Sequence, residues 1–255
     1  PLSYSALTAT PVLTTIHGFS SEKILPVYQR YNNATHYVAI SNADRHPTLD
    51  YAATVYHGVP MAEFSLRSTP DDYLLFFGRI HPDKGVVEAI DVAHRTGRRL
   101  IIAGLIQDQA YFYEKVAPHL DHSQISYIGL VEPGQRNEIL GGAYALLHLI
   151  NFAEPFGLSM IEAMACGTPV IARPLGSIPE IIKHQQTGFM VDSQEEAVAA
   201  VQAVGQLDRA FIRRYTAQNF SCDQMVEGYI RVYQQVLEQH QRQVTLSNQV
   251  VRQLI

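Results

Sequence analysis

The sequence predicts an α/β protein with mostly parallel sheets. Short runs rich in β-branched and aromatic residues alternate with longer amphipathic stretches along most of the chain. Alternation of this kind is typical of βαβ units, which place strands side by side and in parallel. Hydrophobic residues make up 47% of the 255 residues, which is enough apolar material for a buried core. In such a sheet we expect ligands at the carboxyl ends of the strands.

Eight segments have the length and composition of strands. They are 11–16, 35–40, 53–56, 73–77, 100–103, 125–128, 145–150 and 169–172. Helical patterns fill the gaps and continue after Ser193 as three stretches over 194–207, 208–219 and 223–242. Ser221 precedes the last stretch and is a typical N-cap residue. Residues 244–255 have no clear packing partner.

A polar segment separates the first three predicted strands from the others. It contains Pro60 and Pro70, and prolines in a polar context are typical of a linker. We therefore predict four parts of the chain. They are a first part over 1–59, a linker over 60–72, a domain over 73–207 and C-terminal helices over 208–255, which can cross back to the first part.

Charge and cysteine content argue against several classes of protein. The formal net charge of −5 argues against nucleic-acid binding through bulk charge, so a phosphate site would have to be local. Cys166 lies in an apolar stretch and Cys222 is the only other cysteine, which implies no disulfide framework and fits a reducing cytoplasm. Apolar runs such as 143–150 are too short to span a bilayer, while peripheral membrane association stays open.

Residues 154–172, EPFGLSMIEAMACGTPVIA, carry two glutamates eight positions apart. Because eight residues span just over two helical turns, Glu154 in the loop and Glu162 on the helix can both reach a ligand lying across the helix start. The free backbone N–H groups near Gly157 and Leu158 suit a phosphate. Glu162 has apolar neighbours on both sides, so it should be partly buried and need a partner. An ordinary solvated helix glutamate, or an ordinary loop carboxylate for Glu154, is the alternative.

Residues 77–85, FGRIHPDKG, follow a predicted strand and carry two cations. Arg79 can donate to two oxygens at once and Lys84 supplies a point charge, so together they suit a diphosphate that gains negative charge as a bond breaks. The alternative is a solvated arginine and lysine in a loop.

These two segments together resemble the retaining GT-B glycosyltransferases of family 4, also called glycosyl transferases group 1. The resemblance is strongest over 75–191 and weaker over 14–59. It implies two Rossmann-like domains with parallel sheets. On this basis 73–207 would be the domain that binds the nucleotide-sugar donor, and 1–59 the C-terminal part of the acceptor-side domain, with its upstream part missing.

The resemblance also implies a reaction. A sugar would pass from a UDP-sugar or GDP-sugar, bound as substrate, to an unidentified sugar, lipid or small-molecule acceptor, with retention of anomeric configuration. It implies no cofactor and no metal site, because Arg79, Lys84 and the helix start would hold the diphosphate.

By the same resemblance, individual residues receive roles. Arg79 and Lys84 would hold the diphosphate, Glu162 the ribose hydroxyls, and Glu154 would lie beside the donor sugar as nucleophile or as stabiliser of positive charge. The remaining donor-binding candidates are Leu130 and Val131 at the base, and Phe156, Gly157 and Leu158 at the helix start.

His17 is the fourth catalytic candidate, with Glu154, Arg79 and Lys84. It follows a predicted strand and precedes Gly18, and relatives deliver a histidine from such a strand end to the donor sugar. The chain has eleven histidines, so an ordinary structural or solvated histidine is the alternative.

The sequence departs from the family in two places and leaves other functions open. The glycine-rich loop and the strands that precede the histidine strand in relatives are missing, and Ile150-Asn151 replaces a common Pro-Ser pair. One alternative is a nucleotide-sugar-binding subunit or inactive fragment that needs a second chain to supply the missing part. Another is a GT-B sugar phosphorylase or a nucleotide-sugar epimerase.

Overall fold

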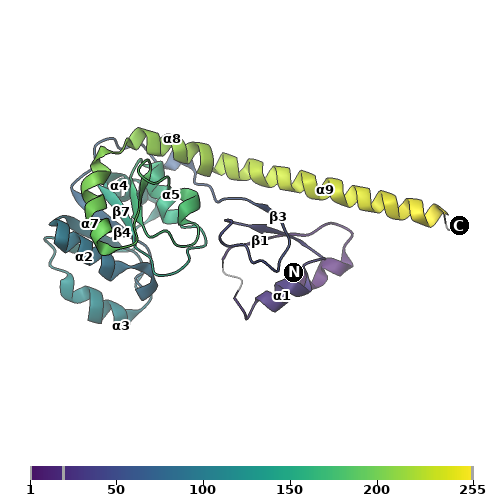
Figure 1. Cartoon of the computed structure of the whole chain (residues 1–255), viewed down its shortest axis with the longest axis horizontal. Coiled ribbons are helices and arrows are strands. Elements are labelled where there is room, and N and C mark those ends of the chain that lie inside the picture. The colour runs from purple at the N-terminus through teal and green to yellow at the C-terminus, as the bar shows by residue number, and fades with distance from the viewer. Residues whose placement is uncertain (1, 19–20, 254–255) are drawn as a thin grey trace. The chain divides into compact units, whose positions relative to one another are not determined.

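The computed structural model describes residues 2–18 and 21–253. The chain divides into two compact units (Figure 1). The first unit comprises Pro1–His57 and Asp223–Ile255, and the second comprises Gly58–Cys222.

The second unit is built on a six-stranded sheet in which all neighbouring strands run parallel. Its strands are β4 Tyr73–Phe77, β5 Arg99–Ala103, β6 Ile125–Gly129, β7 Ala145–His148, β8 Val170–Ala172 and β9 Gly188–Met190. Their spatial order is β6-β5-β4-β7-β8-β9. The chain thus winds outward from β4 in one direction and then from β7 in the other. This is the doubly wound Rossmann order, in which ligands bind beside the two central strands.

Helices cover both faces of this sheet. The α-helices are α2 Val86–Thr96, α3 Gln109–Tyr111, α4 Pro133–Gly142, α5 Leu158–Ala165, α6 Ile178–Ile181, α7 Gln194–Ala203 and α8 Arg209–Phe220. The short helical turns are η2 Met61–Glu63, η3 Pro82–Lys84, η4 Phe112–Val116, η5 Ala117–His119 and η6 Val204–Gln206. Helices α2 and α7 pack together over one face, and α5 packs with α4 and α8 over the other (Figure 1). The core under α2 and α7 includes Leu74, Ile90, Leu147 and Val201, each at most 2% exposed.

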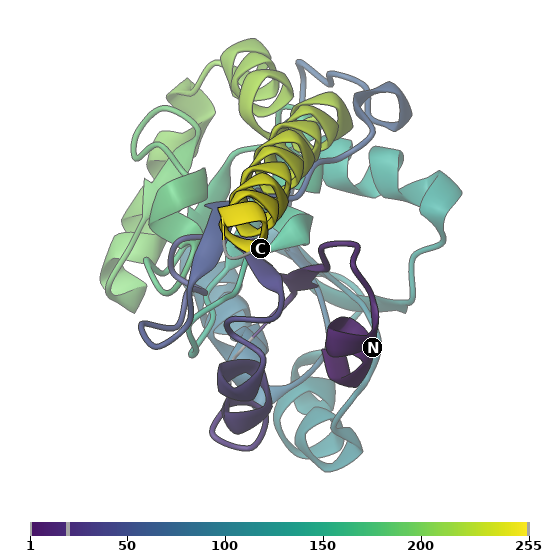
Figure 2. The ribbon, with the colours of Figure 1, turned by 90° about the vertical axis from the view of Figure 1, so that its right-hand side faces the viewer.

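The first unit contains a smaller parallel sheet. Its elements are η1 Leu2–Leu7, β1 Leu13–Ile16, α1 Leu25–Arg30, β2 His36–Ala39, β3 Tyr51–Thr54 and the long helix α9 Cys222–Gln253, with strand order β1-β2-β3. Val232 and Val236 of α9 pack against Val38 and Val55. Figure 2 shows α9 nearly end-on with these strands beside it. Tyr37 belongs to a separate buried cluster and donates to Tyr28 O at 2.8 Å.

All eight predicted strands correspond to strands of the structure; the bounds of 73–77 match β4, and those of the other seven differ by one or two residues at one or both ends. Strand β7 ends at His148, and β3 covers Tyr51–Thr54 in place of 53–56. Strand β9 was not predicted, because its three residues begin with glycine and include no β-branched side chain, unlike those of β8. Helix α9 continues to Gln253, beyond the predicted end at 242, because residues 243–253 contain no glycine or proline to stop it.

The predicted linker, 60–72, lies within the second unit. Two arginines of α8 bind its backbone: Arg209 Nε donates to Arg67 O at 2.6 Å, and Arg213 Nη1 donates to Phe64 O at 2.6 Å. Phe64 is itself buried. The division therefore falls after His57 and after Cys222. The predicted part 208–255 is split between the units, and its last residues, 254 and 255, lie outside the described residues.

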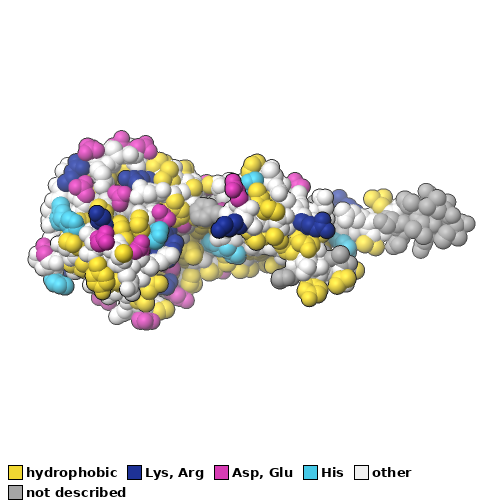
Figure 3. Space-filling model, turned by 90° about the horizontal axis from the view of Figure 1, so that it is seen from below, with side chains coloured by type: hydrophobic (Ala, Val, Ile, Leu, Met, Phe, Trp, Pro, Cys, Tyr) yellow, Lys and Arg dark blue, Asp and Glu magenta, His cyan; other side chains and the backbone are white. Residues whose placement is uncertain are grey.

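Surface properties add two observations. On the face drawn in Figure 3, acidic and basic side chains are interspersed, so neither sign of charge dominates there. Among the described residues, no helix combines the length and the apolar character that crossing a membrane requires.

Candidate functional site

The candidate site is a pocket beside the carboxyl ends of β4 and β7, where a doubly wound sheet binds its ligands. Its volume is about 410 Å³, within the range of small-molecule sites. It is lined by Phe76, Phe77, Gly78, Arg79, Lys84, Arg136, His148, Glu154, Gly157, Leu158, Ser159 and Glu162.

The segment after β4 brings both predicted cations to this pocket. Arg79 is exposed and donates to Gln107 Oε1, from the segment after β5. Lys84 ends the turn η3, which begins where His81 Nδ1 accepts from Asp83 N at 3.3 Å. Gly85 follows with φ of +75°. A Cβ there would lie 2.0 Å from Leu149 O, so only glycine lets the backbone pass and leaves Lys84 pointing at the site.

Lys84 and Glu154 form a largely buried ion pair. Lys84 Nζ lies 2.8 Å from Glu154 Oε2, and the two side chains are 14% and 12% exposed. The ammonium group also lies 4.4 Å from the centre of the Phe152 ring, where the ring face attracts a cation. A backbone hydrogen bond holds the loop that carries Glu154, because Ser177 N donates to Glu154 O at 2.9 Å.

A histidine approaches the same carboxylate oxygen. His148, the last residue of β7, places Nε2 3.4 Å from Glu154 Oε2 with its side chain 7% exposed. Burial alone would raise the pKa of Glu154, but His148 and then Lys84 outweigh it and lower that pKa to about 2. Glu154 is therefore ionised at neutral pH.

The start of α5 supplies backbone donors between the two glutamates. Gly157 precedes the helix with φ of +89°, and the first N–H groups of an α-helix have no partner within it. Leu158 and Ser159, whose N–H groups are among these, line the pocket. An anion at this point would meet free donors and the positive end of the helix dipole.

Glu162 lies on the pocket side of α5 with its side chain 14% exposed. Arg136 of α4 reaches it, with Nη1 3.0 Å from Oε1. Burial raises the pKa of Glu162, and Glu63 adds to the rise, while the Arg136 guanidinium opposes it. The carboxylate is thus held by one cation and partly desolvated, which prepares it to accept hydrogen bonds from hydroxyl groups.

Six predicted residues meet in this pocket: Arg79, Lys84, Glu154, Gly157, Leu158 and Glu162. Phe156 does not line it, because its ring is 2% exposed and packs edge-on against Phe220. Leu130, 66% exposed, and Val131 follow β6, two strands away from β4.

His17 lies in the first unit, directly after β1. Its ring stacks on that of His57 with centroids 5.2 Å apart and an interplanar angle of 11°. Burial and then the neighbouring His17 lower the pKa of His57.

Sequence reasoning missed His148 and Arg136. His148 is the polar residue of an otherwise apolar strand, and a polar side chain at a strand's carboxyl end is a usable signal in this fold. Arg136 lies in the first turns of the helix after β6, where no sequence pattern distinguishes it from a solvated arginine.

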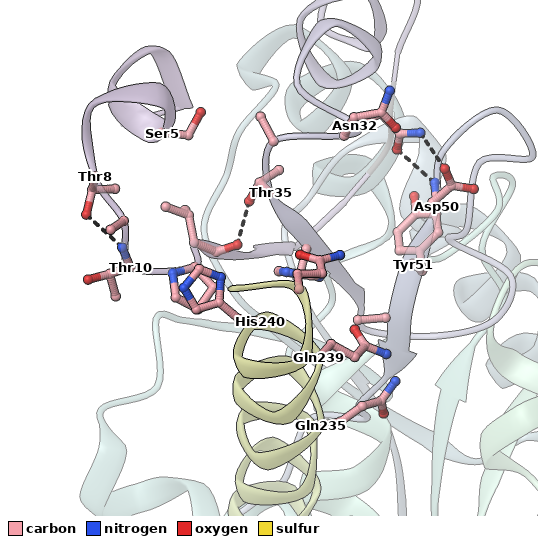
Figure 4. Close-up of a pocket in the computed structure, with 18 residues that line it drawn as sticks. Ser5, Thr8, Thr10, Asn32, Thr35, Asp50, Tyr51, Gln235, Gln239 and His240 are labelled. Atoms are coloured by element: carbon pink, nitrogen blue, oxygen red, sulfur yellow. Dashed lines mark hydrogen bonds between the residues drawn. The ribbon is translucent and has the colours of Figure 1, made fainter. Parts of the chain in front are cut away.

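A second pocket, of about 480 Å³, lies in the first unit (Figure 4). Hydroxyl, amide and imidazole groups line it, and Asn32 pairs with Asp50, with Nδ2 2.7 Å from Oδ2. It lies where β1, β2 and β3 begin, and ligand sites of parallel sheets lie at the opposite ends of the strands. The pocket of the second unit is therefore the better candidate.

Comparison with known proteins agrees with this architecture. Residues 61–209 match the model of the family described as "Glycosyl transferases group 1". The chain belongs to this family. Its α/β architecture, with parallel sheets, is that of GT-B glycosyltransferases.

Among relatives, the D-inositol 3-phosphate glycosyltransferase of Mycobacteroides abscessus is 31% identical over 193 residues, which cover 69% of this chain and 42% of the relative. The chain therefore spans less than half of that relative's length. AviGT4, a glycosyltransferase involved in avilamycin A biosynthesis, is 26% identical with a TM-score of 0.66, over 79% of this chain and 64% of AviGT4. The Anabaena protein HepE, solved with UDP and glucose, shares the fold at 17% identity and a TM-score of 0.72, over 94% of this chain and 75% of HepE.

Proposed function

We propose that the second unit binds a nucleoside-diphosphate sugar, and that the whole protein transfers the sugar to an acceptor as a retaining hexosyltransferase. The observation that carries this proposal is the Lys84–Glu154 pair, 2.8 Å apart, beside the open N-terminus of α5 at the switch point of the sheet. One pocket thus offers positive charge for a diphosphate and a fixed negative charge for the sugar. HepE has been solved with UDP-glucose, a ligand of this class.

The diphosphate would lie between Arg79, Lys84 and the N–H groups at the start of α5. Breaking the bond between phosphate and sugar leaves negative charge on the diphosphate, and preorganised donors in a dry site stabilise such charge strongly. These groups supply the positive charge themselves, so we propose a reaction that needs neither metal nor cofactor. Lys84 would then be shared between Glu154 and the nearest phosphate.

Glu162 would accept the two ribose hydroxyls, with Arg136 keeping its carboxylate in place. Glu154 would lie beside the anomeric carbon. Its low pKa, about 2, keeps it ionised at neutral pH, as both nucleophilic attack and stabilisation of positive charge require. For His17 we propose the catalytic role that the family resemblance implies. Retention requires the acceptor to enter on the face from which the diphosphate leaves.

Calorimetric titration with UDP, GDP and ADP tests the donor site. We expect saturable binding of one diphosphate, weakened at least about tenfold, or about 1.4 kcal/mol, in Glu162→Ala. Glu114→Ala is the matched control, because Glu114 is exposed and away from the pocket, and it should bind like the unmodified chain. Equal binding by both variants would contradict the site, and failure of all three diphosphates to bind would contradict the proposed donor.

A further inference from the structure

The carboxylate of Glu154 is held at one of its two oxygens. Lys84 Nζ and His148 Nε2 both face Oε2, at 2.8 Å and 3.4 Å. Among the described residues Oε1 has no such neighbour. A carboxylate anchored through one oxygen keeps the other available for a ligand.

His148 is an unusual choice for its position. It ends a strand whose four residues are all buried, and its side chain is 7% exposed. Its Nε2 atom is shielded from solvent and makes no well-aligned hydrogen bond among the described residues. A buried polar atom without a partner costs stability that an apolar residue would not. The nitrogen nevertheless faces Oε2, so a small rotation of the ring would align an Nε2–H with that oxygen.

We propose that His148 is a positioning residue, which holds Glu154 through Oε2 so that Oε1 faces the donor sugar. The assignment of the sugar to Oε1 rests on the proposed function, whereas the contact between His148 and Glu154 does not. Lys84 alone cannot fill this role in the donor complex, because its charge is then shared with the diphosphate. The Nε2 atom of His148 is shielded from solvent and faces Oε2 of Glu154, so it would keep the carboxylate oriented when the diphosphate binds.

Three variants separate positioning from packing. His148→Leu and His148→Phe fill the space without a donor, and either suffices if the other fails to fold. His148→Gln keeps an N–H donor on a side chain of similar reach. His94→Leu is the control, because His94 is an exposed histidine on α2 outside the pocket.

The first readout needs no ligand. The side-chain carboxyl of Glu154 is followed by ¹³C NMR against pH, with its signal assigned by loss in Glu154→Gln. The pKa of Glu154, about 2 with His148 as the leading cause of its lowering, should rise by at least one unit in His148→Leu or His148→Phe. It should rise less in His148→Gln and not at all in His94→Leu. An unchanged titration in both non-donor variants would overturn the proposal.

The second readout uses the diphosphate that binds in the titration above and its sugar form: UDP with UDP-glucose, GDP with GDP-mannose, or ADP with ADP-glucose. The non-donor variants should bind the sugar form about five- to tenfold more weakly while the diphosphate changes less than twofold. Equal weakening of both ligands would indicate general damage and overturn the positioning role. If the unmodified chain binds neither, the proposed function fails, and the carboxyl titration still decides whether His148 holds Glu154.

Discussion

The candidate site depends on one buried carboxylate, that of Glu154, whose charge is opposed by burial and stabilised by its neighbours. Removing Glu154 from water favours its neutral form, but Lys84 and His148 favour the charged form more strongly. Because these groups are buried and the local dielectric is low, each neighbour interacts with the carboxylate more strongly than it would in water. Removing one neighbour should therefore be felt both in stability and in the titration of the carboxyl.

Lys84→Met should destabilise the second unit by about 3 kcal/mol, the lower end of the range for breaking a buried ion pair. The cause is an uncompensated buried carboxylate, so adding Glu154→Gln to the same chain should recover most of the loss. Urea unfolding followed by circular dichroism measures both. Arg95→Met, which removes exposed contacts to Asp91 at 3.5 Å and to Glu195 at 3.2 Å, is the control and should change little. A double variant as unstable as Lys84→Met would contradict this account.

The pH dependence of stability should also reflect Glu154. Its pKa is lowered from 4.5 to about 2 in the folded state, so the native state binds fewer protons than the unfolded state in this range. The stabilisation is present above pH 4.5 and is lost as the pH falls toward 2. The stability difference between the unmodified chain and Glu154→Gln should thus shrink between pH 5 and pH 3. Urea unfolding at pH 3, 4, 5 and 7 tests this, and a constant difference would refute it.

Two tight turns between secondary-structure elements position the charged and donor groups of the site. The turn before α2 places Lys84, and the turn before α5 places free N–H groups. Both contain a glycine with positive φ, Gly85 and Gly157, so the backbone conformation is part of the binding geometry.

Gly85→Ala should destabilise the fold far more than Gly97→Ala. Both glycines have positive φ, +75° and +66°. Alanine is strained in that conformation, so both variants should lose a similar amount of folding free energy, about 1 kcal/mol, from this cause. At Gly97 the new Cβ has nothing within 4 Å, whereas at Gly85 it would lie 2.0 Å from Leu149 O. Thermal unfolding should therefore show a much lower midpoint for Gly85→Ala, with reduced nucleotide binding. Equal midpoints would show that the backbone at Leu149, after the end of β7, shifts away from the new Cβ without cost.

Most elements could be predicted from the sequence because their patterns are local. Tyr73–Phe77 is a continuous apolar run between polar segments, and its predicted bounds match β4. The bounds of β3 shifted because its residues are only partly buried and give no alternation. For the site, the spacing of Glu154 and Glu162 was visible, but His148 and Arg136 were not, because their importance comes from partners distant in sequence.

The division of the whole chain into two units depends on hydrogen bonds that hold residues 60–72 in the second unit. Amino-acid composition does not reveal these bonds. Residues 60–72 look like a linker because they are polar and contain prolines. Arginines of α8, 142 and 149 residues later, nevertheless bind two of their carbonyl groups. Long-range contacts of this kind leave no local pattern, and the boundary therefore could not be predicted.

Hydrogen exchange should distinguish the two descriptions of this segment. Arg67 N donates to Cys166 O at 3.1 Å and Asp71 N donates to Gly142 O at 2.8 Å, so both amides should exchange as slowly as those of α8. Ser68 and Thr69, exposed between them, should exchange quickly and serve as internal controls. Rapid exchange at Arg67 and Asp71 would restore the linker interpretation.

The order of the strands has a consequence for how the site comes into being. Lys84 and Glu154 are 70 residues apart and meet only because β4 pairs with β7. Closing so large a loop costs conformational entropy. This cost is offset only when the central strands associate. No short peptide from either loop can therefore hold the ligand. During refolding, nucleotide affinity should arise in step with assembly of the sheet, not with the earlier formation of individual helices.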